Sequence, residues 1–229
     1  MKHISIAIDG PSGAGKSTLA KEISSKLGYL YVDTGAIYRT IGYYVLTQGI
    51  EPTDAAAVTA VLPQVQIRMS YEADGLQHMY LNGRDVTGEI RLPEVSRYAS
   101  DVSAHPPVRS FLLEMQRQLA RENSVIMDGR DIGTVVLPDA DVKIFLTATP
   151  EARARRRWKE LEQRGTPQPY ETVLADIQTR DYNDMNRAIA PLRQADDAGL
   201  LDTTEMNFRE SMEAILELIK EKVGNETAE

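Results

Sequence analysis

The chain has 229 residues, of which 42% are hydrophobic and 26% charged, so it is long enough for one α/β domain with small insertions. It contains no cysteine, which excludes disulfide frameworks, thiolate metal sites and a cysteine nucleophile, and its three histidines are too far apart in sequence to suggest a metal site. A formal net charge of −8, with no apolar run that could span a bilayer and no signal peptide, predicts a soluble cytoplasmic protein that binds neither nucleic acid nor a membrane.

The first predicted elements surround a phosphate-binding loop. Residues 4–9 predict a strand, and residues 18–27 predict a helix with one apolar face. Between them, GPSGAGKS has the G-x-x-x-x-G-K-[ST] spacing of a loop whose backbone N–H groups surround phosphates, and the flanking elements disfavour a plain glycine-rich turn. Lys16 would reach the outer phosphates, and the Ser17 hydroxyl suits Mg²⁺. The predicted phosphate-binding residues are Gly10, Pro11, Ser12, Gly13, Ala14, Gly15, Lys16, Ser17 and Thr18.

An antiparallel insert interrupts the alternation of strands and helices. A buried strand at 29–32, a helix ending near Val45 and a short helix over 54–62 are predicted first. Residues 65–71 then alternate apolar and polar, Ala73–Gly75 predicts a turn, and an extended run from Leu76 ends at the hairpin signal Asn82-Gly83. We therefore expect a small lobe at 63–92 inserted into a core formed by 1–62 and 93–229.

The remaining pattern predicts a doubly wound α/β fold. Helices are expected at 93–102, 106–121, 150–164, 170–188 and 207–222, and strands at 124–128, 142–146 and 199–202. Such alternation implies a parallel sheet covered on both faces, with ligands outside the carboxyl ends of its strands. The predicted cleft there contains the phosphate loop and five polar residues, namely Thr34, Arg39, Asp128, Arg130 and Asp131.

Two motifs near this cleft have both a functional and a plain structural interpretation. Asp128 ends an apolar strand as a Walker-B aspartate does, which suggests a role toward Mg²⁺; the alternative is a polar strand terminus. Arg130-Asp131 alone could equally be a salt bridge in a turn.

The helix at 170–188 carries charge in line with its apolar stripe. Val173, Ile177, Arg180, Asp184 and Arg187 follow one another at three- and four-residue spacing, so they share one face. A solvated face would lie opposite the apolar stripe, so this pattern favours a helix that passes from the core into a polar cleft. Guanidinium groups there suit a phosphate or a carboxylate, although a structural ion-pair ladder is the alternative.

The helix at 150–164 carries an arginine cluster, Arg153, Arg155, Arg156 and Arg157, followed by a glycine–proline hinge. In an acidic protein this cluster suggests a mobile lid at 150–169 that closes over a transferring phosphoryl group. The alternative is a solvated helix with pairs such as Glu160–Arg164.

Four motifs together resemble those of bacterial cytidylate (CMP) kinases. Besides Gly10–Thr18, Asp33–Arg39 resembles D-[ST]-G-A-x-Y-R, and Asp128–Thr134 resembles D-G-R-D-[IM]-G-T. Arg180–Arg187, followed by Ala190-Pro191-Leu192, resembles R-D-x-x-D-x-x-R…A-P-L. The likeness covers nearly the whole chain, and it implies a P-loop nucleoside-monophosphate kinase fold with a core, a lid and an enlarged monophosphate-binding lobe.

The resemblance also implies a reaction and a site. It implies that the protein transfers the γ-phosphoryl group of ATP to CMP or dCMP with Mg²⁺. It also implies that the protein is a monomer. Carried over by motif, the acceptor phosphate would be surrounded by Thr34, Arg39, Arg130, Arg180 and Arg187, and Asp184 would hold the ribose with help from Arg180. The cytosine edge would be read by Ser100, Arg109 and Asp131. The implied catalytic residues are Lys16, Arg130, Arg153, Arg157, Arg180 and Arg187, and the implied metal-binding residues are Ser17 and Asp128.

Other functions stay open at this point. Another small P-loop kinase could act on UMP, AMP or an alcohol such as shikimate, but an alcohol kinase would need a base and fewer arginines at the strand ends. A regulatory nucleotide switch would carry a guanine-reading N-K-x-D stretch, which the sequence lacks.

Overall fold

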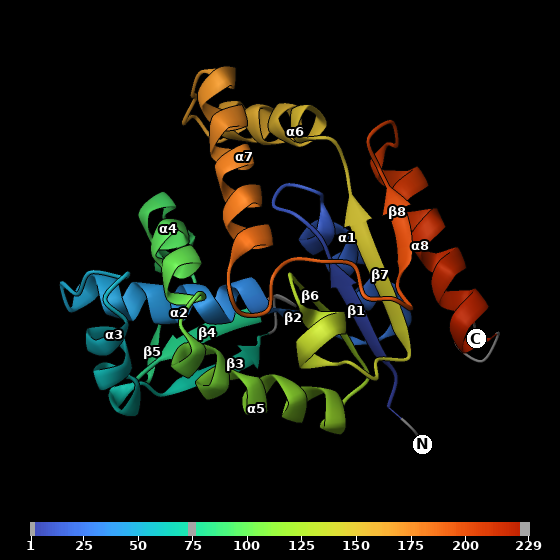
Figure 1. Ribbon diagram of the computed structural model, residues 1–229. Helices are drawn as coiled ribbons and strands as arrows, with labels where there is room; N and C mark the ends of the chain where they lie inside the picture. Colours follow the sequence, from blue (N-terminus) through green and yellow to red (C-terminus); the bar gives the residue numbers. More distant parts are fainter. Residues whose placement is uncertain (1–2, 73–76, 225–229) are drawn as a thin grey trace. The chain divides into compact units, whose positions relative to one another are not determined.

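The computed structural model describes residues 3–72 and 77–224 and alternates strands with helices (Figure 1). The chain forms two compact units, which we call unit 1 (Met1–Tyr31 and Ala120–Glu229) and unit 2 (Val32–Leu119). The insert predicted at 63–92 belongs to unit 2. The turn predicted at Ala73–Gly75, and Leu76 after it, lie outside the described residues. No helix in the described part of the chain is long and apolar enough to cross a membrane.

A parallel sheet positions the loops of unit 1. In the described residues its strand order is β2-β6-β1-β7-β8, with β1 between β6 and β7 (Figure 1). The strands are β1 Ser5–Asp9, β2 Leu30–Asp33, β6 Val125–Gly129, β7 Val142–Thr147 and β8 Gly199–Asp202. β1 runs parallel to β6 and β7, and Asp9 lies opposite Gly129. The loops that follow β1 and β6 therefore leave neighbouring strands at the same level.

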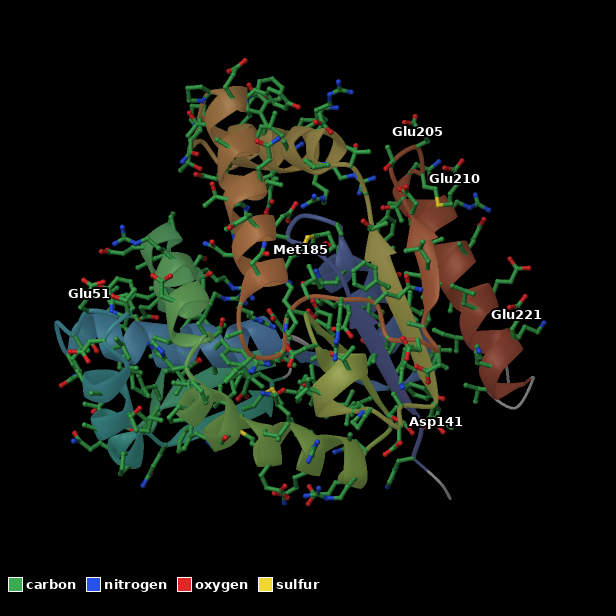
Figure 2. All side chains as sticks on the ribbon, viewed as in Figure 1. Glu51, Asp141, Met185, Glu205, Glu210 and Glu221 are labelled. Atoms are coloured by element: carbon green, nitrogen blue, oxygen red, sulfur yellow. The ribbon has the colours of Figure 1, made fainter. Side chains whose placement is uncertain are left out.

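Two helices, α1 (Lys16–Leu27) and α8 (Phe208–Val223), share one apolar cluster with β1 and β7. Its fully buried members include Ile6, Ile23, Ile144 and Ile215, so burial of these side chains from water holds the layers together. Where β1 and β7 begin, the carboxylate of Asp141, which is labelled in Figure 2, accepts hydrogen bonds from the backbone N–H and the hydroxyl of Ser5 at 2.9 and 3.1 Å.

A second pair of helices, α6 (Pro150–Gln163) and α7 (Tyr170–Asn186), packs through a smaller apolar cluster in unit 1. The cluster contains Ala154, Leu161, Val173 and Ile177. Because both helices contribute to it, the segment predicted as a lid, 150–169, is packed against the first half of α7.

Unit 2 combines helices with the predicted antiparallel sheet. Its helices include α2 Thr34–Thr47, α3 Ala55–Val61, α4 Pro93–Val102 and most of α5 Pro106–Glu122. The strands are β3 Ile67–Tyr71, β4 Gln77–Leu81 and β5 Arg84–Asp85, and the turn Asn82-Gly83 has positive φ at both residues, as its sequence predicts. Short helical turns, η1 Leu62–Gln64 and η2 Glu89–Arg91, flank the sheet along the chain.

The structure confirms the predicted α/β class and sheet arrangement, but the sequence patterns do not predict η2 or a further short element beside the sheet of unit 1. Residues Ile132–Val136 form a π-helical turn, η3, directly after β6. Its start is held by a hydrogen-bonded carboxylate from β1, which is a long-range contact and leaves no local signal.

Candidate functional site

The phosphate loop joins β1 to α1 and requires glycine at its first position. Gly10 has φ of +151°, and a Cβ there would lie 1.9 Å from the backbone oxygen of Leu146 in β7. Gly13 and Gly15 also have positive φ, at +77° and +92°. The loop thus takes a backbone path that residues with a side chain rarely adopt, and it lies against the end of β7.

Lys16 is buried at the base of this loop, with an exposed fraction of 5%. Its Nζ donates to the backbone oxygens of Gly10 and Pro11 at 2.7 and 2.8 Å. Burial, reinforced by the charge of Arg130, lowers the pKa of Lys16 to about 7 against the opposing effect of nearby carboxylates. A bound anion would raise this pKa again, because an opposite charge favours the ammonium form.

Ser17 and Asp128 form a set of oxygen donors beside the loop. Ser17 Oγ donates to Asp128 Oδ2 at 2.8 Å, and the hydroxyl of Tyr31 donates to the other carboxylate oxygen, also at 2.8 Å. Mg²⁺ prefers such hard oxygen ligands and usually completes its shell with water and substrate phosphates. The described residues contain no group of three or more acidic, histidine or cysteine side chains that could hold a metal ion. The hydroxyl and the carboxylate are oxygen donors of the kind that Mg²⁺ accepts.

Asp9, the last residue of β1, connects the two loops of the sheet edge. Its carboxylate accepts the backbone N–H groups of Ile132 and Gly133, each at 2.7 Å. Burial raises the pKa of Asp9 to about 6, although the two backbone hydrogen bonds favour its ionised form. Asp9 was not among the predicted site residues, although its position as an acidic residue at the end of an apolar strand could have indicated a role.

The segment after β6 pairs with the end of α7 through two ion pairs. Arg130 Nε donates to Asp184 Oδ2 at 2.6 Å, and Arg187 Nη2 donates to Asp131 Oδ1 at 3.2 Å. Burial alone would raise the pKa of Asp184, but the charge of Arg130 and its hydrogen bond outweigh burial and lower it. The same pair raises the pKa of Arg130 in spite of burial. The cluster is thus an alternating set of two cations and two anions.

The predicted face of α7 is present, with one addition. Val173 and Ile177 are buried, Asp184 is paired with Arg130, and Arg180, although exposed, is close enough to lower the pKa of Asp184. Asp181 was not among the predicted site residues; it is buried and lies four residues beyond Ile177, on the continuation of the same stripe. That spacing was the signal available.

The arginines of α6 have different surroundings. Arg153 is 3% exposed and bound to Asp181, and Arg156 donates to the hydroxyl and the backbone oxygen of Thr203. Arg157 is 41% exposed and paired only with its neighbour Glu160 in the described structure, while Arg155 is exposed. Exposed pairs of this kind contribute little to stability, so Arg157 can reorient at small cost whereas Arg153 cannot.

In unit 2, two of the predicted site residues lie at the start of α2. Asp33 caps this helix by accepting from Ala36 N at 2.9 Å, and it also accepts from Arg39 Nη2 at 2.8 Å. The buried Nε of Arg39 has no hydrogen-bond partner within the described residues, and Thr34 is buried.

The other two predicted residues of unit 2 lie on α4 and α5. Arg109 is buried, donates to the backbone oxygen of Ser103 at 3.2 Å and lies 5.4 Å from the ring centre of Tyr38. The backbone oxygen of Ser100 accepts from the Ser103 hydroxyl at 2.7 Å. Within unit 1, the structure brings together the phosphate loop, Asp128, Arg130, Asp131, Asp184 and Arg187; within unit 2 it places Thr34 and Arg39 on α2.

Comparison with known proteins identifies the family. A sequence model described as cytidylate kinase matches residues 6–221. The cytidylate kinase of Caldicellulosiruptor bescii is 51% identical over 226 residues, which cover 99% of this chain and 100% of that protein. That of Desulfitobacterium hafniense is 50% identical over 222 residues, covering 97% and 95%.

A solved structure agrees with the fold alone. An uncharacterized protein from Eubacterium ventriosum has a TM-score of 0.53 and 11% identity, and the match covers 95% of this chain and 99% of that one. With its phosphate loop, its paired strand-end motifs and matches at this level over nearly the full length, the chain belongs to the cytidylate kinase family.

Proposed function

We propose that the protein transfers the γ-phosphoryl group of ATP to CMP or dCMP, giving ADP and CDP or dCDP. The observation that carries this proposal is the pairing of Asp9 with Gly129 across β1 and β6. Because of it, the phosphate loop and the Arg130-Asp131 segment begin side by side, so donor-binding and acceptor-binding groups start from one edge of the sheet.

On the donor side, the loop would bind the ATP phosphates through its backbone N–H groups and the N-terminus of α1. Lys16 is already held at the loop by two carbonyl oxygens and would exchange these for phosphate oxygens. Ser17 and Asp128 would hold Mg²⁺, which supplies charge neutralisation at the β- and γ-phosphates. Tyr31 supports this role by fixing the orientation of the Asp128 carboxylate.

On the acceptor side, we assign the phosphate of CMP to Arg130, Arg187 and the exposed Arg180, as the motifs predict. The carboxylate of Asp184 would accept the ribose hydroxyls, and that of Asp131 the exocyclic amino group of cytosine. Since a phosphate is ionised at neutral pH, the reaction needs no strong base, and the arginines act by aligning and neutralising two anions. The side chain of Arg157 is partly exposed and weakly paired, which suits a group that closes on the transferred phosphoryl group.

For unit 2, we retain Thr34 and Arg39 as acceptor-phosphate residues and Ser100 and Arg109 as cytosine-reading residues. The unpartnered Nε of Arg39 favours its assignment, because a buried donor without an acceptor is costly and a phosphate oxygen would satisfy it. The anchored guanidinium of Arg109 likewise suits a fixed donor toward a base edge.

The test is an assay of ADP release from ATP with CMP, dCMP, UMP, AMP, GMP and shikimate as acceptors. We expect CMP and dCMP to give the highest turnover, with CDP and dCDP as chromatographically identified products. Failure of CMP to stimulate ADP release would overturn the proposal. Lys21→Ala, an exposed change on α1, provides a control for effects of substitution alone.

A further inference from the structure

The guanidinium of Arg153 in α6 is almost fully occupied by protein oxygens. Its Nε donates to the backbone oxygen of Ala148 at 2.8 Å, and its Nη1 donates to Asp181 Oδ1 and to the backbone oxygen of Ser12, each at 2.9 Å. Its Nη2 donates to Asp181 Oδ2 at 2.5 Å. A guanidinium has five N–H donors, and these contacts use four of them within the described residues.

The contact with Ser12 connects this buried pair to the phosphate loop. In a trans peptide, the C=O of one residue and the N–H of the next point in opposite directions. Holding the Ser12 oxygen on the side of α6 therefore turns the N–H of Gly13 to the other side, away from Arg153. Gly13 has φ of +77° and no side chain, so the hydrogen bond to Arg153 fixes a peptide next to a residue with wide conformational freedom.

Packing at the tip of the loop supports the same connection. A Cβ on Gly13 would lie 3.3 Å from Cβ of Arg153 and 3.7 Å from Cδ1 of Ile177 in α7. The loop thus lies directly against the wall formed by α6 and α7, which carries the Arg153–Asp181 pair.

We propose that Arg153 is a positioning residue for the phosphate loop, acting with Asp181 to fix the Ser12–Gly13 peptide so that the Gly13 N–H is presented to the nucleotide phosphates. The inference rests on the proposed function in one respect only, that the loop binds ATP. It replaces the expectation that Arg153 itself contacts the transferred phosphoryl group.

The two roles predict opposite results for Asp181→Asn. This change leaves the arginine in place and weakens its hold. If Arg153 instead contacted the transferred phosphoryl group, Arg153→Lys and Asp181→Asn would mainly lower kcat and would leave the Kd of ATP measured without CMP near the wild-type value. If Arg153 acts through Asp181, each single change should raise the KM for ATP and the equilibrium Kd of ATP measured without CMP, both at least tenfold. The double variant should then be no worse than the more affected single variant, while the KM for CMP changes less than threefold.

Lysine is an informative replacement because it keeps the charge but cannot bind a carboxylate through two parallel donors. Asp176→Asn, on the exposed side of α7, and the double change Arg209→Lys with Glu213→Gln, in an exposed pair of α8, serve as controls. These should leave the Kd of ATP unchanged.

A variant that lacks both charges but still folds can separate a loss of ATP binding from a loss of stability. Arg153→Met with Asp181→Leu replaces the buried ion pair by apolar side chains of similar size, a change that proteins often tolerate. We expect it to unfold cooperatively near the wild-type temperature and still bind ATP at least tenfold more weakly. Wild-type ATP affinity in this variant, or additive effects in the Arg153→Lys and Asp181→Asn cycle, would overturn the inference. Direct ATP binding separates this result from failure of the proposed function, which would appear as normal ATP binding without transfer to CMP.

Discussion

Arg130 Nε lies 2.6 Å from Asp184 Oδ2, so a residue predicted to bind the acceptor phosphate is held by one predicted to bind the ribose. The two side chains are 22% and 14% exposed, which makes this pair mostly buried. The pair therefore holds the guanidinium of Arg130 in a fixed position and neutralises its charge.

Replacing the carboxylate of Asp184 should weaken both the binding of CMP and the stability of the fold. We expect Asp184→Asn to raise the KM for CMP at least tenfold and to lower the free energy of unfolding by about 2–4 kcal/mol, because Arg130 loses its partner. Thermal unfolding with and without inorganic phosphate tests the cause, since phosphate should stabilise this variant more than the wild type. Asp176→Asn on the same helix is the control, and equal effects of the two changes would contradict the prediction.

Lys16→Ala should separate catalysis from stability. We expect kcat to fall by about 10²–10³-fold, since a charge on the transferring group is lost. Stability should stay constant or rise, because a lysine whose pKa is lowered to about 7 by burial opposes folding. Steady-state assays and thermal unfolding measure the two effects, with Lys21→Ala as the control; near-normal turnover would exclude the assigned role.

Asp131→Asn should alter base selectivity. Cytosine presents an amino donor to the carboxylate where uracil presents an acceptor, so we expect the ratio of kcat/KM for CMP over UMP to fall at least ~tenfold. The KM for ATP should change much less. Asp139→Asn, an exposed change later in the same loop, controls for the loss of charge. An unchanged ratio would remove Asp131 from base reading.

The raised pKa of Asp9 should make the free energy of unfolding fall as the pH rises, the opposite of the usual effect of an aspartate. Its folded pKa of about 6 lies above the ordinary value of 3.8, so between these values the folded protein binds more protons than the unfolded chain. Stability from this group therefore falls as pH rises from about 4 to 6, by about 3 kcal/mol in total. Urea unfolding at pH 4.5 and 7 should show this component in the wild type and not in Asp9→Asn; identical pH dependence in both would refute the prediction.

The sequence predicted the elements well and the partners of individual side chains less well. Periodicity and glycine spacing depend on local geometry, so they indicated the phosphate loop, the strand ends and the apolar half of α7. The Arg153–Asp181 ion pair and the hydrogen bonds from η3 to Asp9 depend on how elements that are distant in sequence are oriented in the fold. The sequence therefore indicated that α6 carries a cluster of arginines, but not that one of them is buried.

Three of the charged residues at and just beyond the end of α7 are each bound to a different part of unit 1. Asp181 pairs with Arg153, Asp184 with Arg130, and Arg187 with Asp131. Residues three apart on a helix differ in height by about 4.5 Å. Sliding α7 along its axis by that amount toward its N-terminus would bring Arg187 to the level of Arg130, so two cations would meet. The order of charges therefore disfavours a one-step slide of α7 along its axis, whereas a swing could open the pairs one after another from one end.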